Sequence, residues 1–339
     1  MGQEIGFCQF GAGRIGQIHA ANIAAHAGAR LAYIVDVNAG AAEALARRHG
    51  TATATAEAAL ADPAVGAVVI ASSTDSHAPL IEAAALAGKA VFTEKPIDLS
   101  LARVERCLEA VAKAGVILQV GFNRRFDPSF AALHRQLRAG RIGKTEMVII
   151  TSRDPAPPPL AYVEVSGGLF RDMTIHDFDM ARWLMGAEPV ELYATASCLV
   201  APAIGELGDA DTAAVTLRTA DGAICLISNS RRAAYGYDQR IEVLGAGGQL
   251  RVENRLPTAL EVSDGEAVSR DKPLYFFLER YAESYRAELD HFIACLAEGG
   301  TPTVSARDGW AALYLAEAAL ESWRSGCPVR LDRLQGDTL

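Results

Sequence analysis

Residues 5–16 read Ile-Gly-Phe-Cys-Gln-Phe-Gly-Ala-Gly-Arg-Ile-Gly. The first half of this stretch has the apolar character of a buried strand, and the second half matches the pattern G-x-G-x-x-G where a helix would begin. In such a turn the first glycine permits a tight bend, the second lets a pyrophosphate approach the backbone, and the third lets the helix pack closely on the strand. Free N–H groups at the start of the helix also favour phosphate. The turn therefore predicts a dinucleotide site with contacts from Gly11, Gly13, Arg14, Ile15 and Gly16.

An acidic residue completes this pattern further along the chain. Asp36 ends the next strand-like segment, 20 residues after Gly16, which is the interval expected for the residue that binds the adenosine ribose. A carboxylate there would repel a 2′-phosphate, and neither Val37 nor Asn38 carries a positive charge to neutralise one. NAD is therefore expected rather than NADP. The alternative is an ordinary glycine-rich turn followed by a surface aspartate.

Strand-like and helix-like segments alternate through the first third of the chain. Segment 67–71 is apolar throughout, which is typical of a strand buried on both faces. The alternation predicts an α/β fold with a Rossmann-type, doubly wound parallel sheet. The expected strands are 5–10, 31–36, 67–71, 90–93 and 117–120, and the expected helices are 15–27, 39–49, 79–87 and one that Ser100 caps and that ends at Gly115.

The pattern changes after residue 121, where turns such as Ala220-Asp221-Gly222 and Ser263-Asp264-Gly265 indicate antiparallel strands. We expect an NAD-binding domain over 1–122 and an α+β domain over 123–339 that binds substrate, forms oligomers and has a large, mostly antiparallel sheet. Its terminal helix can pack back on the first domain. The expected strands here are 145–152, 190–199, 212–217, 223–228, 240–244 and 249–252, and the expected helices are 128–138, 281–297 and 306–323.

Polar residues follow two of the expected buried strands. Segment 72–77 reads Ser-Ser-Thr-Asp-Ser-His, and segment 93–96 reads Thr-Glu-Lys-Pro. Ligands of such sheets bind at the carboxyl ends of the strands, so both loops are expected to reach the cofactor. The alternatives are a helix-capping loop, an idle surface histidine and a surface lysine. The expected contacts are Ser72, Ser73, Thr74, His77, Glu94 and Lys95.

An acid and an imidazole lie together in segment 167–179, which reads as a helix that follows two glycines. Asp172 and His176 are four residues apart and so share one face of a regular helix. A carboxylate beside an imidazole suits proton transfer, because it orients the ring and holds its tautomer. One alternative is a surface ion pair. Another is a metal site that adds Asp179, but the sequence identifies no further ligands, so no metal is expected.

The composition limits the classes of partner. The chain has 339 residues, 22% of them charged, and a net charge of −9 without a basic run. Nucleic acid and anionic membranes both require concentrated positive charge, so neither is expected as a partner. No apolar run reaches the ~18 residues of a membrane-spanning helix, and the first residues lack a secretory signal pattern. With six scattered cysteines and no CxxC pair, a reducing cytoplasm is expected.

Together these motifs resemble the Gfo/Idh/MocA oxidoreductase family over essentially the whole chain. The segments that carry the resemblance are the glycine-rich turn, Asp36, the Glu94-Lys95-Pro96 turn and the Asp172/His176 helix. Segments 123–127, 152–155 and 235–240 resemble the family members that oxidise inositol. One departure is Gln9-Phe10 before the first glycine, where smaller residues are usual; it should not abolish cofactor binding.

The resemblance implies NAD-dependent oxidation of a cyclic polyol, myo-inositol to 2-keto-myo-inositol. Lys95, Asp172 and His176 would form the catalytic group, with His176 as general base, Lys95 stabilising the developing alkoxide and Asp172 binding the hydroxyl or relaying the proton. It also implies a homotetramer formed through the sheet of the second domain. The alternatives are a dehydrogenase of scyllo-inositol or a glucose-like sugar, a lyase or hydrolase with tightly held NAD, and a non-catalytic NAD-binding regulator. The implied substrate contacts are Arg125, Asp154, Asp172, His176 and Tyr235.

Overall fold

The computed structural model describes residues 4–336, and their contacts divide them into two compact units. Unit 1 comprises residues 4–126 and 284–313, and unit 2 comprises 127–283 and 314–336. The chain therefore returns to unit 1 late in the sequence. The boundary between 122 and 123 stays a prediction of the sequence; residues 284–313 join the first unit in the grouping by contacts.

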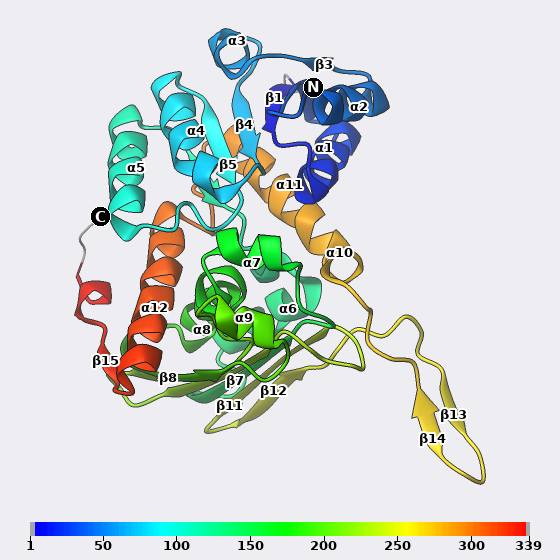
Figure 1. The fold of residues 1–339 in the computed structure, drawn as a ribbon, viewed down its shortest axis with the longest axis vertical. Helices are drawn as coiled ribbons and strands as arrows, with labels where there is room; N and C mark the ends of the chain where they lie inside the picture. Colours follow the sequence, from blue (N-terminus) through cyan, green and yellow to red (C-terminus); the bar gives the residue numbers. More distant parts are fainter. Residues whose placement is uncertain (1–3, 337–339) are drawn as a thin grey trace. The chain divides into compact units, whose positions relative to one another are not determined.

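Unit 1 is built on a six-stranded sheet in the order β3-β2-β1-β4-β5-β6, in which all pairs are parallel. The strand order reverses between β1 and β4, which is the switch point where ligands bind in such sheets. Helix α1 packs beside α2, and α4 beside α5 (Figure 1). The expected doubly wound parallel sheet is confirmed. The strands are β1 Ile5–Phe10, β2 Ala29–Val35, β3 Ala52–Thr53, β4 Ala67–Ile70, β5 Ala90–Thr93 and β6 Leu118–Val120, and the helices are α1 Arg14–Ala25, α2 Ala39–His49, α3 Ala56–Ala61, α4 Thr74–Leu86, α5 Leu101–Ala114 and the 3-10 turn η1 Asn123–Phe126.

Two helix starts differ from the sequence-based expectation. Helix α4 begins at Thr74 rather than at Pro79, so the polar segment after β4 forms its first turn. Pro79 removes one helical hydrogen bond without marking the start. Ser100 holds the N-cap position of α5, but its side chain makes no capping hydrogen bond. Its backbone N–H donates instead to Asp98 Oδ1, at 2.8 Å.

Helix α11, Ala282–Glu298, belongs to unit 1 from residue 284 because its apolar face packs on the parallel sheet. The ring of Phe292 meets Phe7 of β1 and Phe92 of β5 edge to face, with centroids 6.3 and 5.9 Å apart. Leu289 and Ile293 join the same buried cluster. A segment distant in sequence thereby completes the core beneath the sheet.

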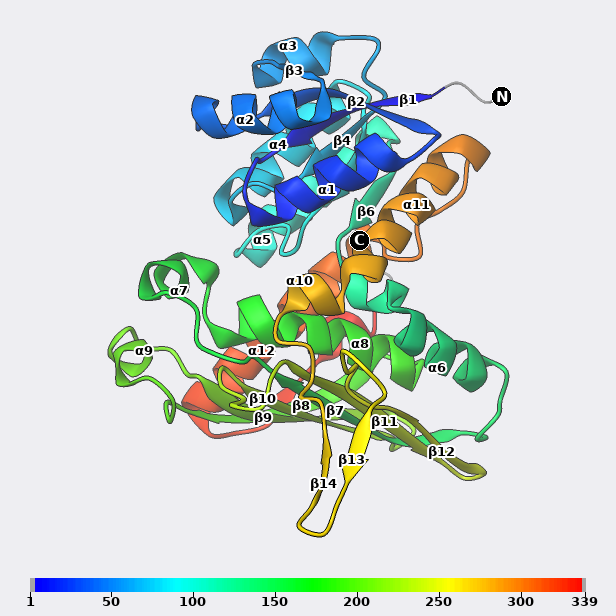
Figure 2. The same ribbon diagram turned by 90° about the vertical axis from the view of Figure 1, so that its right-hand side faces the viewer.

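Unit 2 contains a seven-stranded sheet in the order β12-β11-β7-β10-β9-β8-β15. Only β7 and β10 pair in parallel, and the other pairs are antiparallel, so the expected mostly antiparallel sheet is confirmed. Helices α6 and α8 lie on one face of it (Figure 2). The strands are β7 Thr145–Arg153, β8 Pro189–Ser197, β9 Thr212–Thr219, β10 Ile224–Ser230, β11 Asp238–Gly245, β12 Gly248–Val252 and β15 Val329–Arg330, and the helices are α6 Pro128–Arg138, α7 Leu160–Ser166, η2 Phe170–Thr174, α8 Ile175–Met185, α9 Pro202–Glu206, α10 Phe277–Arg280, η3 Asp332–Leu334 and α12 Ala306–Ser325, whose first part lies in unit 1.

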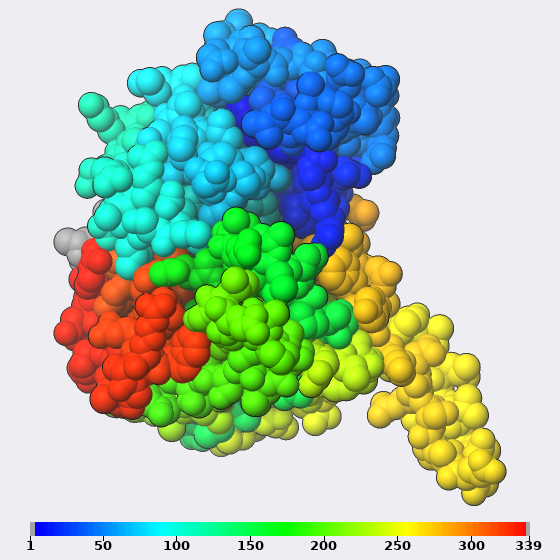
Figure 3. All heavy atoms as spheres, viewed as in Figure 1, coloured from blue at the N-terminus to red at the C-terminus, as the bar shows by residue number. Residues whose placement is uncertain are grey.

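The two faces of this sheet differ in burial. Side chains that point toward α8, such as Ile150 and Ile227, are buried, whereas Tyr193, Leu226 and Leu244 on the other face are exposed. A two-stranded hairpin, β13 Glu261–Ser263 and β14 Val268–Arg270, forms at the expected turn and stands out from the rest of unit 2 (Figure 3). None of the described helices combines the length and apolar composition that a membrane-spanning segment needs.

A buried ion pair fixes the start of α6. Asp127 caps this helix by accepting hydrogen bonds from the N–H groups of Ser129 and Phe130, at 3.0 and 3.1 Å. Its other carboxylate oxygen accepts from the guanidinium of Arg280, and these two side chains are only 2% and 4% exposed. The guanidinium also lies over the rings of Phe130 and Tyr281. Because both charges are out of water, each depends on the other for compensation.

We expect Arg280→Ala to lower the free energy of unfolding by about 3–5 kcal/mol, because it leaves the buried Asp127 charge without its partner. Urea unfolding of the purified protein measures this. The matched control is Arg270→Ala, which breaks an exposed pair with Glu261 whose atoms are 3.7 Å apart and should change stability by less than about 0.5 kcal/mol. Equal losses in the two variants would show that the buried pair has no special weight.

Candidate dinucleotide and catalytic sites

The glycine-rich turn between β1 and α1 contains glycines of two kinds. Gly11 has φ +98°, and a Cβ on Gly16 would lie 2.1 Å from the carbonyl oxygen of Gly11. The chain itself therefore requires both glycines. A Cβ on Gly13 would meet nothing within 4 Å. The space above Gly13 is open, as expected where a pyrophosphate is to approach the backbone.

The N-terminus of α1 suits an anion. Gly13 is the N-cap residue, no side chain caps the helix, and its first turn contains no acidic residue. Its N–H groups and its dipole are thus available to negative charge. From beneath, the buried side chain of Gln9 donates from Nε2 to the carbonyl oxygen of Gly11, at 3.2 Å. The unusual residue before the first glycine therefore supports the turn, and the residues present fit a dinucleotide.

Asp36 ties the glycine-rich turn to the end of β2. Its Oδ2 accepts a hydrogen bond from the N–H of Ala12 at 2.6 Å, and its Oδ1 accepts from the N–H of Asn38 at 2.8 Å. A carboxylate has about four lone-pair positions, so it can still accept from ribose hydroxyls. The predicted ribose contact stays a prediction, and the structure adds a second role, which is to hold the turn in place.

The loops after β4 and β5 are joined by His77, a residue of α4 that is 2% exposed. Its Nδ1 lies 2.8 Å from the carbonyl oxygen of Pro96, and its Nε2 lies 3.2 Å from the carbonyl oxygen of Ser72. The ring is therefore neither solvated nor idle. It holds together the two loops that carry the predicted cofactor contacts, next to Lys95, whose peptide bond to Pro96 is cis.

Sequence reasoning missed a second buried histidine in unit 1. The fully buried ring of His19 on α1, which the sequence suggests is a packing or surface residue, places Nε2 2.8 Å from Oε1 of Glu94. The buried carboxyl of Glu288 on α11 lies beside them, with one atom of each group within 4.8 Å of the others. Among residues 4–336 these are the only three His, Cys, Asp or Glu side chains close enough to share an ion. Burial and the charge of Glu94 raise the pKa of Glu288 well above 4.5, so this group holds a proton rather than offering a second charged ligand.

In unit 2 the helix that carries Asp172 and His176 is not regular. Phe170–Thr174 form a π-helical turn that leads into α8, so the expected i, i+4 placement on one α-helical face is wrong in its geometry. Such wider turns are rare and occur frequently at functional sites. Asp172 instead accepts from the hydroxyl of Tyr162 at 2.8 Å and from both terminal nitrogens of Arg231 at 3.2 Å.

The two partners of Asp172 were not predicted from the sequence. Arg231 follows β10 and is 1% exposed, and Tyr162 lies on α7. Desolvation of the phenol, and then the charge of Asp172, raise the pKa of Tyr162. Tyr162 therefore keeps its proton and donates it. The paired guanidinium and the phenol hold Asp172 as an anion in a fixed orientation.

A buried polar network fixes α8 on the sheet. Asn229 of β10 donates to Asp177 Oδ2 at 2.8 Å and accepts from the hydroxyl of Thr174 at 2.7 Å. The same amide donates to the carbonyl oxygen of Ser152 at 3.3 Å. Since Asp177 and Asn229 are both about fully buried, the orientation of the helix that carries His176 is strongly determined.

The three weaker substrate candidates lie in different places. Arg125 belongs to unit 1, where its guanidinium donates to Asp308 at 2.9 Å and to the carbonyl oxygen of Thr303 at 3.0 Å. In unit 2, Tyr235 donates to Asp238 at 2.5 Å, and the backbone of Asp154 pairs with Ser230 beyond the end of β7. Their substrate contacts stay predictions, and Arg125 already has a structural role.

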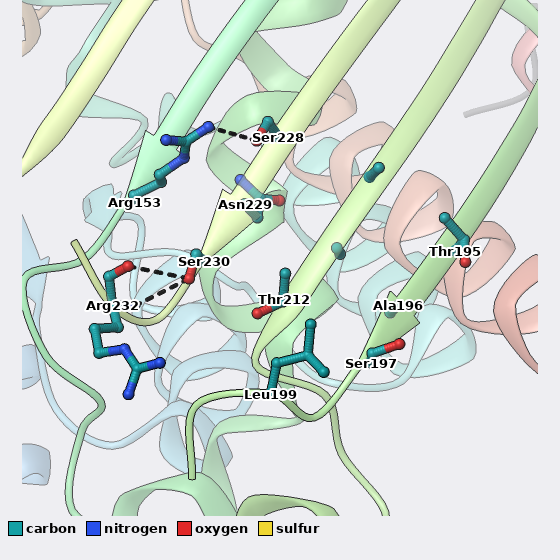
Figure 4. Close-up of a pocket in the computed structure, with 12 residues that line it drawn as sticks. Arg153, Thr195, Ala196, Ser197, Leu199, Thr212, Ser228, Asn229, Ser230 and Arg232 are labelled. Carbon is teal, nitrogen blue, oxygen red and sulfur yellow. Dashed lines mark hydrogen bonds between the residues drawn. The ribbon is translucent and has the colours of Figure 1, made fainter.

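A shallow cavity of about 440 Å³ lies on the outward face of the unit 2 sheet (Figure 4). Thr195, Thr212 and Ser228 line it from neighbouring strands, together with Arg153. These side chains point away from the face that α8 covers, because successive strand residues alternate between faces. The cavity is therefore separate from Asp172 and His176, and we do not assign the substrate to it.

The contrast between Gly13 and Gly16 separates cofactor binding from folding. We expect Gly13→Ala to leave thermal stability unchanged, because its methyl group enters open space, but to weaken NAD binding by about tenfold or more through contact with the pyrophosphate. We expect Gly16→Ala to lower the melting temperature itself. Calorimetric melting and NADH fluorescence titration measure the two effects. Unchanged NADH affinity in Gly13→Ala would place the pyrophosphate elsewhere.

Two family models together cover most of the chain. Residues 5–122 match an oxidoreductase family with an NAD-binding Rossmann fold, and residues 130–251 match the Gfo/Idh/MocA C-terminal domain. The inositol 2-dehydrogenase of Rhizobium meliloti is 51% identical over 93% of this chain and 96% of the relative. The myo-inositol 2-dehydrogenase of Thermotoga maritima is 48% identical over 96% and 98%.

The fold is likewise shared with solved structures. A scyllo-inositol dehydrogenase from Lactobacillus casei, crystallised with NAD(H) and scyllo-inositol, superposes with a TM-score of 0.90 at 29% identity and covers 97% of this chain and 99% of its own. The resemblance of the sequence motifs is thus confirmed over nearly the full length. The chain belongs to the Gfo/Idh/MocA family of NAD-dependent oxidoreductases.

Proposed function

We propose that this NAD-dependent dehydrogenase oxidises a secondary hydroxyl of a cyclic polyol, with myo-inositol as substrate and 2-keto-myo-inositol as product. The observation that carries the proposal is the 51% identity to an inositol 2-dehydrogenase over 93% of the chain. The site supports it, because an anionic Asp172 held by Arg231 and Tyr162 can accept hydrogen bonds from hydroxyl groups. A polyol offers many such donors.

NAD, when bound, supplies the hydride acceptor. In the proposed reaction His176 takes the proton of the substrate hydroxyl as general base. The charge of Lys95 stabilises the oxygen as it becomes an alkoxide, and Asp172 binds the hydroxyl or relays the proton. Lys95 is in unit 1 and the other two residues are in unit 2, so the proposal requires both units to serve one substrate.

The remaining contacts are proposed from their positions at the edge of the parallel sheet. Substrate contacts are proposed for Asp154 and Tyr235, and for Arg125 only if its pairing with Asp308 leaves a donor for substrate. The proposed cofactor contacts are Gly11, Gly13, Arg14, Ile15, Gly16, Asp36, Ser72, Ser73, Thr74, His77, Glu94 and Lys95.

We further propose a homotetramer in the cytoplasm. The outward face of the unit 2 sheet exposes Tyr193, Leu226 and Leu244, and apolar side chains on an open sheet face suit contact with another copy. Burial raises the pKa of the Cys8 and Cys107 thiols to about 12, so both stay protonated and behave as small apolar groups. Such thiols suit a reducing compartment.

Steady-state assays with a polyol panel test the substrate. We expect NADH formation with myo-inositol and NAD, and slower turnover with scyllo-inositol and glucose. Scyllo-inositol is the second candidate, because the similar Lactobacillus casei structure contains it. Inert myo-inositol with rapid turnover of another polyol would reject the substrate but keep the dehydrogenase. NAD binding without turnover of any polyol would favour a regulator, and substrate loss without net NADH would favour lyase or hydrolase chemistry.

We expect His176→Ala to lower kcat by about 10²-fold or more at neutral pH, the scale for losing a general base. NADH affinity should stay close to that of the wild type, because the residue is proposed to act on the substrate. The control is His26→Ala, which removes a partly exposed ring 3.8 Å from Asp290 and should leave kcat unchanged. A near-normal kcat in His176→Ala would exclude this residue as the base.

A further inference from the structure

The carboxyl group of Glu288 is a buried ionisable group in unit 1 that the reaction above does not use. Glu288 and His19 are both 0% exposed, and Glu94 is nearly as enclosed, with 12% of its side chain exposed. Neither carboxyl oxygen of Glu288 has a hydrogen-bond partner within residues 4–336. A buried group left in this way costs free energy unless it is neutral or finds a partner.

The hydrogen bond between His19 and Glu94 settles which nitrogen of the imidazole carries a proton. A carboxylate only accepts, so the Nε2 atom 2.8 Å from Glu94 Oε1 must be the donor. In the neutral ring Nδ1 is then an acceptor that needs a donor. Nδ1 is buried and also lacks a partner among the described residues. The neutral acid of Glu288, in the same cluster, is a group with a proton to offer.

Glu94 is confined on its other side as well. A Cβ on Gly121, just after β6, would lie 3.2–3.3 Å from the carboxyl atoms of Glu94, so the carboxylate lies against the backbone there. Gln119 of β6 donates to the main-chain carbonyl of Glu288 at 2.9 Å and ties α11 to the same strand. Glu94 directly precedes Lys95, so whatever orients Glu94 also orients the turn that carries the lysine.

We propose that Glu288 is a positioning residue for the cofactor edge of unit 1: as a neutral acid it holds His19 in the tautomer that donates to Glu94, and thereby fixes the Glu94–Lys95 turn. The proposal rests on the proposed role of that turn in binding NAD. The groups that face Glu288 are His19 from α1, Glu94 after β5 and Tyr285 of α11, whose ring meets His19 edge to face at 5.9 Å. None of them is a fixed cation, so loss of the proton would set two buried carboxylates against each other.

The direction of the pH effect follows from this arrangement. Desolvation and the Glu94 charge raise the pKa of Glu288 above its ordinary 4.5, so the proton is retained at low pH and lost as pH rises through the raised value. NADH affinity should accordingly weaken at alkaline pH. Folding also becomes harder from pH 4.5 upward, because the native state must keep a proton that the unfolded chain releases.

The test compares Glu288→Gln and Glu288→Leu by NADH fluorescence titration between acid and alkaline pH, without substrate. We expect the amide, which can still donate to Nδ1, to keep the wild-type Kd within about twofold and to remove its alkaline rise. The leucine, which cannot donate, should raise Kd about tenfold, the scale of one lost hydrogen bond to a charged network. The exposed Glu298→Gln on the same helix is the control and should titrate like the wild type.

The proposal is overturned if the folded leucine variant binds NADH as the wild type does, or if Glu288→Gln keeps the alkaline rise. Should the leucine variant not fold, the pH profile of Glu288→Gln decides. The melting temperature gives a second readout: the advantage of Glu288→Gln over the wild type should grow as pH rises above 4.5. Because NADH binding needs no polyol, failure of the substrate proposal would leave this test intact.

Discussion

Helix α1 begins so close to the end of β1 that only glycine fits at Gly11 and Gly16, where added side chains would meet backbone atoms at 2.4 and 2.1 Å. This approach directs the N-terminus of α1 over the carboxyl edge of the sheet. The strands beside β1 run parallel to it, so the loops after β4, β5 and β6 reach the same edge. The cofactor chemistry of the chain depends on this one steric constraint.

Buried charges in the molecule are held by partners on other elements. Asp127 has Arg280, Asp172 has Arg231, and Arg125 has Asp308. Each pair crosses between segments far apart in the chain and costs desolvation that good hydrogen-bond geometry offsets. Glu288 differs from these groups, since burial and a neighbouring carboxylate raise its pKa and a proton takes the place of a counter-charge.

Unit 2 places its reactive helix by a different method. The wide turn at Phe170–Thr174 ends on α8, and the Asn229 network holds the first residues of that helix to β10. A π-helical turn changes the direction of side chains relative to a regular helix. Asp172 is therefore directed to Arg231 and Tyr162 rather than being simply a surface neighbour of His176 on a helix face.

Local pattern alone determined the parallel and antiparallel sheets, the glycine-rich turn and the interval to Asp36, because strand period, helix period and turn chemistry act over a few residues. The same patterns left out β3 and α3, which are too short to show a period, and placed the start of α4 too late. Only the tertiary structure decided the partners: Arg231 for Asp172, Glu94 for His19, and the return of α11 to the first sheet. Periodicity specifies which face of an element is buried, but the residue that meets it there depends on how distant segments pack.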